Sequence, residues 1–510
     1  MNVLLITADQ WRGDSFGAAG HPVVKTPNID RLAGQSVMFS RHFAQAVPCS
    51  PARACLYTGL YQMTNRVCRN GTPLDRRHDT LALAARRAGY DPTQFGYTDV
   101  AQDPRLHEGR DPWLTTYEGV LPGMSVRVRL PEDGKPWLSW LKARGVDVSK
   151  GLDIYLPEHG PADPPRGAPP AYSADDTETA YLAGEFLRWL GEQDRPWFAH
   201  VSFLRPHPPF IVPEPYASMY SPDQGPDFVR AATPQAEAAQ HPYIAYSLAT
   251  VQKTNFVHGA SGSIGDWDDA ARRQIRATYW GMISEVDAQI GRIMEGLEAV
   301  DMTDDTLVVL TSDHGEMLGD RHLYGKLGWF DQSFHVPLIV RDPGGRRGAR
   351  IDRFTESVDI VPTILERIGA PVPDHLDGRS LVPLLEGAEP STWRREAHWE
   401  FDFREVATGA TEQAFGLPLD ALNLAVVRGD RFKYVHFGGQ SGGLPPLLFD
   451  METDPGELTN LADDPAWRDV RLEMAEKLLS WRARHLDRRL TGIELTDAGP
   501  VAAGLERRKP

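Results

Sequence analysis

The chain alternates short apolar runs with amphipathic segments over its first three quarters. Continuous apolar runs are typical of strands buried on both faces, and they lie at 3–7, 36–39, 197–203, 305–311 and 336–340. Helical spacing is found in several of the intervening segments, at 26–35, 173–193 and 359–370, with a helix followed by a strand over 79–97. The pattern therefore predicts strands that alternate with helices.

The clearest predicted helix covers residues 268–298. Its apolar positions recur at steps of three and four residues and form one stripe: Ile275, Tyr279, Met282, Val286, Ile290, Ile293 and Leu297. Strands and helices that alternate in this way indicate an α/β fold, with a large, mainly parallel sheet flanked by helices.

Polar residues follow four of the predicted strands. Asp9, Tyr97, His207 and Asp313 each come just after an apolar run. In sheets of this type, ligands bind beyond the carboxyl ends of the strands. We therefore expect these four side chains to converge on one cleft.

After about residue 385 the pattern changes to that of antiparallel strands. These strands are predicted at 396–403, 422–437 (with a turn at "RGDR") and 445–450, before a closing helix at 465–485. We predict three parts: a catalytic domain at 1–384, a smaller α+β subdomain with an antiparallel sheet at 385–489, and a tail or oligomerisation arm at 490–510. The last part, together with the long loop at 215–265, favours a homodimer or homotetramer.

Composition excludes some classes of protein. The chain is 41% hydrophobic and 24% charged, as in ordinary globular proteins, and its formal net charge is −16. That sign disfavours nucleic acid as a partner, and no apolar run is long enough to cross a membrane. The N-terminal run lacks the basic region of a signal peptide, and three cysteines are few for a disulfide framework. We therefore expect a cytoplasmic protein.

Several candidate chemical groups are weak signals when taken singly. Asp313 and His314 could form half of a divalent metal site, although a helix-capping turn explains the pair equally well. Asp9 alone is more often a turn residue. His207 lies among prolines that fix its backbone, which suits a histidine held for proton transfer. Lys326 is a candidate anion-binding cation, but most single lysines are only solvated.

The run "CSPARACLYTG" is much more specific. Cys49, Pro51 and Arg53 form C-x-P-x-R, and a T-G segment follows. This resembles the signature of the formylglycine-dependent sulfatases of the alkaline phosphatase superfamily. Segments along nearly the whole chain are similar too, among them "KTPNIDRLA", "RPHPPF" and "GKLGWFDQSFHVPLIV". The resemblance is strongest to the branch of bacterial phosphonate monoester hydrolases and promiscuous arylsulfatases.

The resemblance implies a metal centre around a modified cysteine. A formylglycine-generating enzyme would read Pro51 and Arg53 and oxidise Cys49 to formylglycine, which would be both the nucleophile and a metal ligand. The resemblance also implies that Asp9, Asp313 and His314 complete the metal shell.

Further contacts with the substrate are implied by the same resemblance. Arg53 would steady the formylglycine diol and the anion, and Asn70 and Lys326 would contact the transferred group. His207 would assist the leaving group or bind a substrate oxygen. Tyr97 lies in "GYTD", where many sulfatases carry a G-K-W-H segment.

Two departures from the family pattern change these expectations. Typical sulfatases begin with two adjacent aspartates and pair the later aspartate with asparagine, whereas Gln10 and His314 stand here. One carboxylate fewer and one imidazole more favour Mn²⁺, with Zn²⁺ or Ca²⁺ as alternatives. The missing G-K-W-H argues against strict sulfatase specificity. A carboxylate at Asp99 is expected to repel a second negative charge on the substrate.

Together these features predict a hydrolase of sulfate monoesters with promiscuous activity on phosphonate monoesters and phosphodiesters, all small anionic esters. A metal offsets the charge of the ester and activates one hydroxyl of the diol. The covalent ester then collapses through the second hydroxyl, so no water has to attack sulfur or phosphorus. A primary phosphonate monoester hydrolase and phosphodiesterase with side sulfatase activity is the alternative.

Two other classes stay open. A transferase or mutase of the same superfamily would use unmodified Cys49 or a hydroxyl as its nucleophile, and a binding protein could use the fold without catalysis. Cys55 is expected to pack as a small apolar residue, and Cys68 has no strong case for a functional role.

Overall fold

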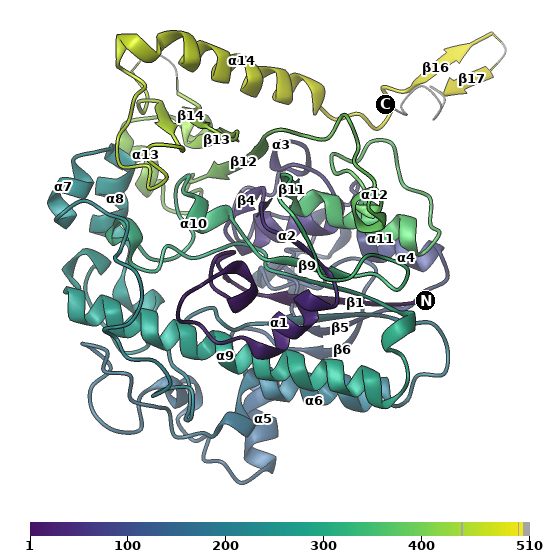
Figure 1. Ribbon diagram of the computed structural model, residues 1–510, viewed down its shortest axis with the longest axis vertical. Helices are drawn as coiled ribbons and strands as arrows, with labels where there is room; N and C mark the ends of the chain where they lie inside the picture. Colours follow the sequence, from purple (N-terminus) through teal and green to yellow (C-terminus); the bar gives the residue numbers. More distant parts are fainter. Residues whose placement is uncertain (440–441, 498, 503–510) are drawn as a thin grey trace.

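The computed structural model describes residues 1–439, 442–497 and 499–502 (Figure 1). Its largest feature is an eight-stranded sheet with the strand order β10-β2-β9-β8-β1-β7-β5-β6. The strands of this sheet are β1 (Asn2–Ala8), β2 (Val37–Phe39), β5 (Pro92–Gly96), β6 (Ser125–Arg129), β7 (Phe198–Phe203), β8 (Thr306–Thr311), β9 (Leu338–Arg341) and β10 (Ala349–Ile351).

Strand direction in this sheet follows the connections. β1 runs parallel to β7 and β8, and β5 runs parallel to β6 and β7. β9 is antiparallel to β8 and β2, within a sheet that the sequence predicted as mainly parallel. The connection from β8 to β9 holds one short α-helix, α10 (Asp331–Phe334). Without a full crossover helix the chain returns in the opposite direction, so the sheet is mixed.

Helices cover both faces of the sheet, because alternate residues of a strand point to opposite sides. Leu4 and Ile6 of β1 belong to the core shared with α1, α6 and α9, whereas Val3 and Leu5 belong to the core shared with α2, α4 and α11. These helices are α1 (Pro27–Gly34), α2 (Cys49–Thr58), α4 (Leu81–Arg87), α6 (Glu178–Leu190), α9 (Asp269–Ala299) and α11 (Ile360–Arg367). The predicted α/β fold class is confirmed, as is the long helix at 268–298.

A second sheet has the order β15-β14-β13-β12-β4. Its antiparallel part and the helix packed on it are β12 (Ala397–Asp402), β13 (Asn423–Arg428), β14 (Phe432–Phe437), β15 (Leu447–Asp450) and α14 (Arg468–Arg484). These elements confirm the predicted antiparallel sheet and closing helix. The fifth strand, β4 (Ala46–Val47), pairs in parallel with β12 and was not predicted. Residues far outside 385–489 therefore complete this sheet, and β4 directly precedes α2.

Shorter elements complete the described part of the chain. β3 (His42–Phe43) pairs with β11 (Thr355–Glu356), and β16 (Ile493–Thr496) pairs with β17 (Gly499–Ala502) in a hairpin that projects from the body (Figure 1). The remaining described α-helices are α3 (Gln62–Asn65), α5 (Lys135–Ala143), α7 (Pro234–Ala238), α8 (Pro242–Thr250), α12 (Val382–Glu386) and α13 (Ala410–Phe415). Among the described helices, none combines the length and apolar character needed to cross a membrane. The end of the predicted tail, 503–510, lies outside the described residues, and the three predicted domain ranges stay a prediction.

Candidate active site

Four adjacent strands bring the predicted polar residues to one edge of the large sheet. Asp9, Tyr97 and Asp313 lie just beyond the carboxyl ends of β1, β5 and β8, and His207 follows β7. The Tyr97 hydroxyl donates a hydrogen bond of 2.6 Å to the Asp9 carboxylate. The predicted convergence of these side chains is therefore confirmed.

Cys49 is the first residue of α2 and faces two of these strand ends. Its Sγ lies 3.3 Å from His314 Nε2 and 3.9 Å from Asp9 Oδ1. Ligand atoms of Asp9, Cys49, Asp313 and His314 all lie within 4.8 Å of one another, and all four side chains are buried. We call these four residues the Cys49 cluster.

The donors of the Cys49 cluster fit a divalent cation. Nδ1 of His314 donates to the Gly315 carbonyl at 3.1 Å, so its Nε2 offers a lone pair toward the carboxylates. That Nε2 lies 3.7 Å from an oxygen of Asp9 and 3.7 Å from an oxygen of Asp313. Carboxylates with one imidazole suit Mn²⁺ or Zn²⁺ better than Ca²⁺, which prefers oxygen ligands alone.

Arg53 holds the two carboxylates in place. Its Nε donates to Asp313 at 2.9 Å and its Nη2 donates to Asp9 at 3.2 Å, while Nη1 donates to Ser202 Oγ at 3.0 Å. The guanidinium also stacks over the Tyr97 ring, 4.3 Å from its centroid. The side chain is fully buried, so its contacts are with the cluster and its supports rather than with the open cavity.

Burial and neighbouring charges together set the protonation of the cluster. Burial, with the neighbouring Asp9 carboxylate, raises the pKa of Asp313 to about 7. Burial, with the nearby Lys326 ammonium, lowers the pKa of His314 to about 3. At neutral pH the imidazole is therefore neutral, as a metal ligand must be. Burial also raises the pKa of the Cys49 thiol, so Asp313 and Cys49 are the members of the cluster with a proton to lose.

A cavity of about 1010 Å³ adjoins the cluster. Three of the predicted substrate-binding residues line it: Asn70, His207 and Lys326. Its far wall comes from the second sheet and the loop after it, including Phe401, Phe403 and Arg404. The large sheet thus supplies the reactive groups, and the C-terminal part supplies much of the space for the rest of a ligand.

Two of the lining residues are oriented by backbone contacts. The oxygen of Asn70 accepts the Ser50 N–H at 3.0 Å, which leaves its amide NH₂ for another acceptor. Nδ1 of His207 donates to the Pro208 carbonyl at 2.7 Å, which leaves Nε2 free. Burial, together with Lys326, lowers the pKa of His207 to about 3, so the free Nε2 accepts rather than donates at neutral pH.

Gln10 and Glu316 are part of the site and were missed by sequence reasoning as site residues. Lys326 Nζ donates to the Gln10 side-chain oxygen at 2.6 Å, and the Gln10 amide donates in turn to buried Glu316. Glu316 also accepts the N–H groups of Leu318 and Gly325. For Gln10, the position directly after Asp9 was the only sequence signal of a role in the site. Glu316 had none, because it meets Gln10 only once the chain has folded.

The surroundings of Asp99 bear on the charge that its carboxyl was expected to carry. Asp99 is buried and has a left-handed backbone conformation, with φ of 50°. Burial raises the pKa of its carboxyl well above the ordinary value, and the Asp9 charge adds to this although Arg53 opposes it. A raised pKa favours the neutral acid, which would weaken the repulsion of a second negative charge. The repulsion expected from the sequence stays a prediction.

The remaining cysteines have no place in the cluster. All three cysteines are free and buried. Cys55 lies in the core between α2 and the second sheet, and Cys68 Sγ contacts the Arg66 carbonyl at 3.3 Å.

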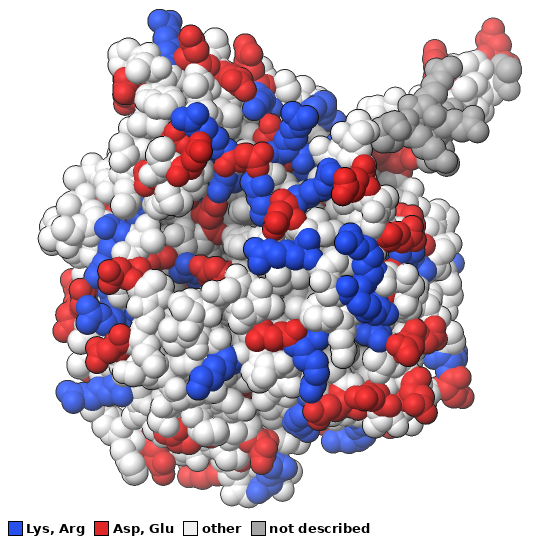
Figure 2. Space-filling view, viewed as in Figure 1, with Lys and Arg blue, Asp and Glu red and all other residues white. Residues whose placement is uncertain are grey.

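Charge on the outside of the molecule is mixed. In Figure 2 lysine and arginine alternate with aspartate and glutamate over the visible face, without a broad patch of one sign. On this face the two signs are mixed, and the net charge of −16 does not by itself exclude an anionic substrate.

Comparisons with known proteins agree with this geometry. The sulfatase family model matches residues 1–370, and a model of the C-terminal region of N-sulphoglucosamine sulphohydrolase matches 319–484. The chain is 42% identical to the multifunctional alkaline phosphatase superfamily protein PehA of Trinickia caryophylli, over 98% of each chain. It is 28% identical to an arylsulfatase of Clostridium perfringens, over 94% of this chain and 93% of the relative.

A solved structure shows the same similarity in three dimensions. The phosphonate monoester hydrolase of Agrobacterium radiobacter is 58% identical, with a TM-score of 0.96 and 100% of both chains covered. The chain therefore belongs to the sulfatase family of the alkaline phosphatase superfamily, as a hydrolase of sulfate or phosphonate esters.

Proposed function

We propose that the protein is a metal- and formylglycine-dependent hydrolase whose primary substrates are phosphonate monoesters, with sulfate monoesters and phosphodiesters cleaved in the same site. The observation that carries this proposal is the buried Cys49 cluster beside a cavity of about 1010 Å³. Cys49 begins α2 with its sulfur directed at two metal-type ligands. A formylglycine at that position would share them.

The order of substrates differs from the sulfate-first order favoured by the sequence. Relatives named phosphonate monoester hydrolases are 58% and 38% identical and cover nearly the whole chain, whereas the arylsulfatase is 28% identical. Those identities support phosphonate esters as the first choice. A sulfate-first enzyme with side activity on phosphonates is the second candidate, supported by the sulfatase family match.

The side chains of the site suit an anionic ester. Formylglycine formed from Cys49 would supply a hydroxyl nucleophile, and a cation held by the cluster would lower the pKa of that hydroxyl and offset the charge of the ester. Lys326 lines the cavity as a cation, and the Asn70 amide can donate to a substrate oxygen. Arg53 donates to both Asp9 and Asp313 and so holds the two carboxylates in a fixed orientation. Of the candidate metals, we propose Mn²⁺.

The partners and location follow from the same proposal. A formylglycine-generating enzyme is the required maturation partner, because the chemistry depends on oxidised Cys49. We place the protein in the cytoplasm as a homodimer or homotetramer, without a nucleic-acid or membrane partner.

One experiment separates the candidate functions. Enzyme of verified mass and metal content is assayed for kcat/KM on a phosphonate monoester, an aryl sulfate, a phosphodiester and a phosphate monoester. The proposal predicts the phosphonate monoester first and an intact mass about 18 Da below that of the unmodified cysteine. Aryl sulfate in first place supports the second candidate, and a preferred phosphate monoester contradicts both.

Matched cysteine variants test the nucleophile. Cys49→Ala is expected to lose about 10³-fold or more in kcat/KM, whereas Cys55→Ala, also buried but outside the cluster, should stay within about threefold. A fully active enzyme with an unoxidised Cys49 would instead support a thiol-based transferase or mutase.

A further inference from the structure

His207 lies on a loop, and other residues of the protein have to fix the position of that loop. The loop leaves β7 and runs through residues 204–209, and the His207 side chain lines the catalytic cavity. The residue hydrogen-bonds through its backbone N–H to the Leu204 carbonyl at 3.0 Å and through Nδ1 to the Pro208 carbonyl at 2.7 Å. Both contacts stay within the loop, so neither ties it to the rest of the fold.

Arg205 makes the contacts that enclose His207. Its Nη1 donates to the His207 carbonyl at 2.9 Å and to the Pro209 carbonyl at 2.8 Å. One guanidinium nitrogen thus holds the backbone on the C-terminal side of the histidine. The Arg205 side chain is 6% exposed, so these bonds compete little with water.

A buried acid anchors Arg205 to a helix. Its Nη2 lies 3.0 Å from Glu178, whose side chain is 4% exposed and which is the first residue of α6. The Tyr155 hydroxyl donates to the same carboxylate at 2.6 Å, and the Arg205 guanidinium lies 5.1 Å from the Tyr155 ring centroid. The helix N-terminus favours a negative charge at this position. Arg205, Tyr155 and the helix N-terminus therefore all hold this carboxylate in place.

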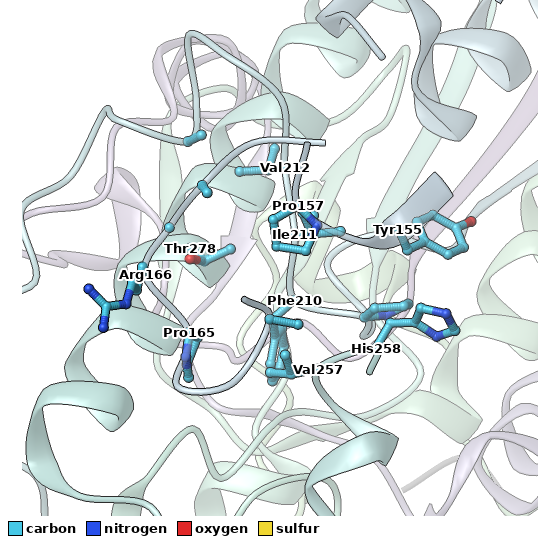
Figure 3. A pocket seen from close by; sticks show the side chains of 15 residues that line it. Tyr155, Pro157, Pro165, Arg166, Phe210, Ile211, Val212, Val257, His258 and Thr278 are labelled. Atoms are coloured by element: carbon cyan, nitrogen blue, oxygen red, sulfur yellow. The ribbon is translucent and has the colours of Figure 1, made fainter. Parts of the chain in front are cut away.

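The anchor is itself fixed to the core. Thr177 caps α6 by accepting the Ala180 N–H at 3.0 Å, and its hydroxyl donates to Glu285 of α9 at 2.6 Å. Tyr155 also lines a cavity of about 30 Å³ together with Phe210, Ile211 and Val212, which follow the His207 loop (Figure 3). Hydrogen bonds through Thr177 and Tyr155 and the ion pair of Arg205 therefore link α9, α6 and the loop.

We propose that Arg205 is a positioning residue for His207, held by the ion pair with Glu178, and that this pair fixes the loop and with it the place of the His207 ring in the cavity. The expected effect on kcat/KM rests on the proposed function, whereas the expected effect on the stability of the loop does not. Lysine cannot replace Arg205, because a single ammonium cannot hold two carbonyls and a carboxylate in the fork that a guanidinium offers.

Kinetics test the functional half. Arg205→Lys and Glu178→Gln are expected to lower kcat/KM for the best ester about tenfold to hundredfold, since a small displacement of a site residue has effects of this size. In a variant that already carries His207→Ala, each of the two changes should lower kcat/KM further by less than about threefold, because Arg205 acts through His207. An equal further loss in both backgrounds would overturn the proposal.

A matched control tests whether general destabilisation explains a kinetic loss. Asp342 forms a comparable buried ion pair with Arg367 beyond β9, at the end of the sheet opposite the site, and its side chain is 3% exposed. Asp342→Asn makes the same acid-to-amide change as Glu178→Gln. It is expected to keep wild-type kcat/KM, and an equal kinetic loss in this control would count against a specific role for Arg205.

Hydrogen exchange tests the structural half without any substrate. Backbone amides of residues 204–212 should exchange at least about tenfold faster in Arg205→Lys than in the wild type. In Asp342→Asn their exchange rates should equal those of the wild type. If the wild type cleaves none of the tested esters, the proposed function fails, and exchange alone decides this inference. Wild-type exchange in Arg205→Lys would refute it.

Discussion

At the scale of single residues, the site brings several carboxyl groups into one small volume. Contacts with Arg53 and differences in pKa reduce the repulsion among them. Asp313 and Asp9 share Arg53, yet burial raises the pKa of Asp313 to about 7. Asp99 has its pKa raised as well. A cation that enters the Cys49 cluster must therefore displace a proton before it binds to Asp313.

Metal binding should depend on pH for that reason. Below pH 7 Asp313 is protonated, so the apparent affinity for Mn²⁺ should fall about tenfold for each pH unit below 7 and level off above it. His314, with its pKa near 3, adds no proton in this range. Titration calorimetry at about pH 5.5 and about pH 8 measures the effect, with circular dichroism to show that the fold persists. Equal affinity at the two values would contradict the raised pKa.

Asp99→Asn tests the charge at that position. Burial raises the pKa of the Asp99 carboxyl well above its ordinary value and so favours the neutral acid. For a neutral Asp99, an isosteric amide should change the ratio of phosphate monoester to phosphodiester turnover less than about threefold. An ionised Asp99 predicts instead that the phosphate monoester gains about tenfold or more. The ratio of the two kcat/KM values, measured on the same enzyme preparation, distinguishes these states.

At the scale of elements, β5 has to approach β7 closely before Tyr97 can reach Asp9. Gly96 ends β5 with φ of 104°, and a Cβ at this position would lie 2.1 Å from the Ser202 carbonyl oxygen of β7. Ser202 also accepts a hydrogen bond from Arg53. A side chain at residue 96 would therefore push the strand end away from the cluster.

Gly96→Ala should destabilise the protein by about 3 kcal/mol, from backbone strain and overpacking together, and should also lower kcat/KM. Gly89→Ala is the matched control, because Gly89 has a similar φ of 90° and a Cβ there would have nothing within 4 Å. Chemical denaturation of both variants gives the difference. Equal losses would mean that strain alone acts and that the close approach of β5 to β7 has no cost.

Elements with local signals could be predicted from the sequence, and those decided by distant partners could not. The apolar stripe of α9 and the buried run of β1 are properties of their own residues. The reversed direction of β9 and the pairing of β4 with β12 depend on which strands meet after folding. The same holds in the site: the C-x-P-x-R motif identified Cys49, but no spacing links Arg205 to Glu178.

At the scale of the whole molecule, apolar side chains gather at the C-terminal end. Leu472, Leu479 and Leu486 are 59%, 69% and 65% exposed and follow one another at seven-residue steps along α14 and just beyond it. Leu495 of the projecting hairpin is 80% exposed. Exposed apolar side chains that cluster on a folded chain are typical of interaction sites.

We propose that a second copy of the chain covers this surface, because one chain offers both the apolar stripe and the hairpin, and a two-fold pair would match each with the other. Leu479→Ser with Leu486→Ser should shift the mass measured by light scattering toward a smaller species. Leu106→Ser, at a leucine that is 54% exposed elsewhere, is the control and should leave the mass unchanged. A monomeric wild type would rule the pairing out.

The pairing of β4 with β12 has a consequence for the timing of maturation. Cys49 is 4% exposed in the folded protein, so a modifying enzyme could not reach it there. β4, two residues upstream, pairs with a strand that lies about 350 residues later in the chain. At about 5–20 residues per second, the ribosome needs roughly 20–70 s to make that partner. During this interval the segment around Cys49 lacks its strand partner, which gives a modifying enzyme its opportunity to act on the nascent chain.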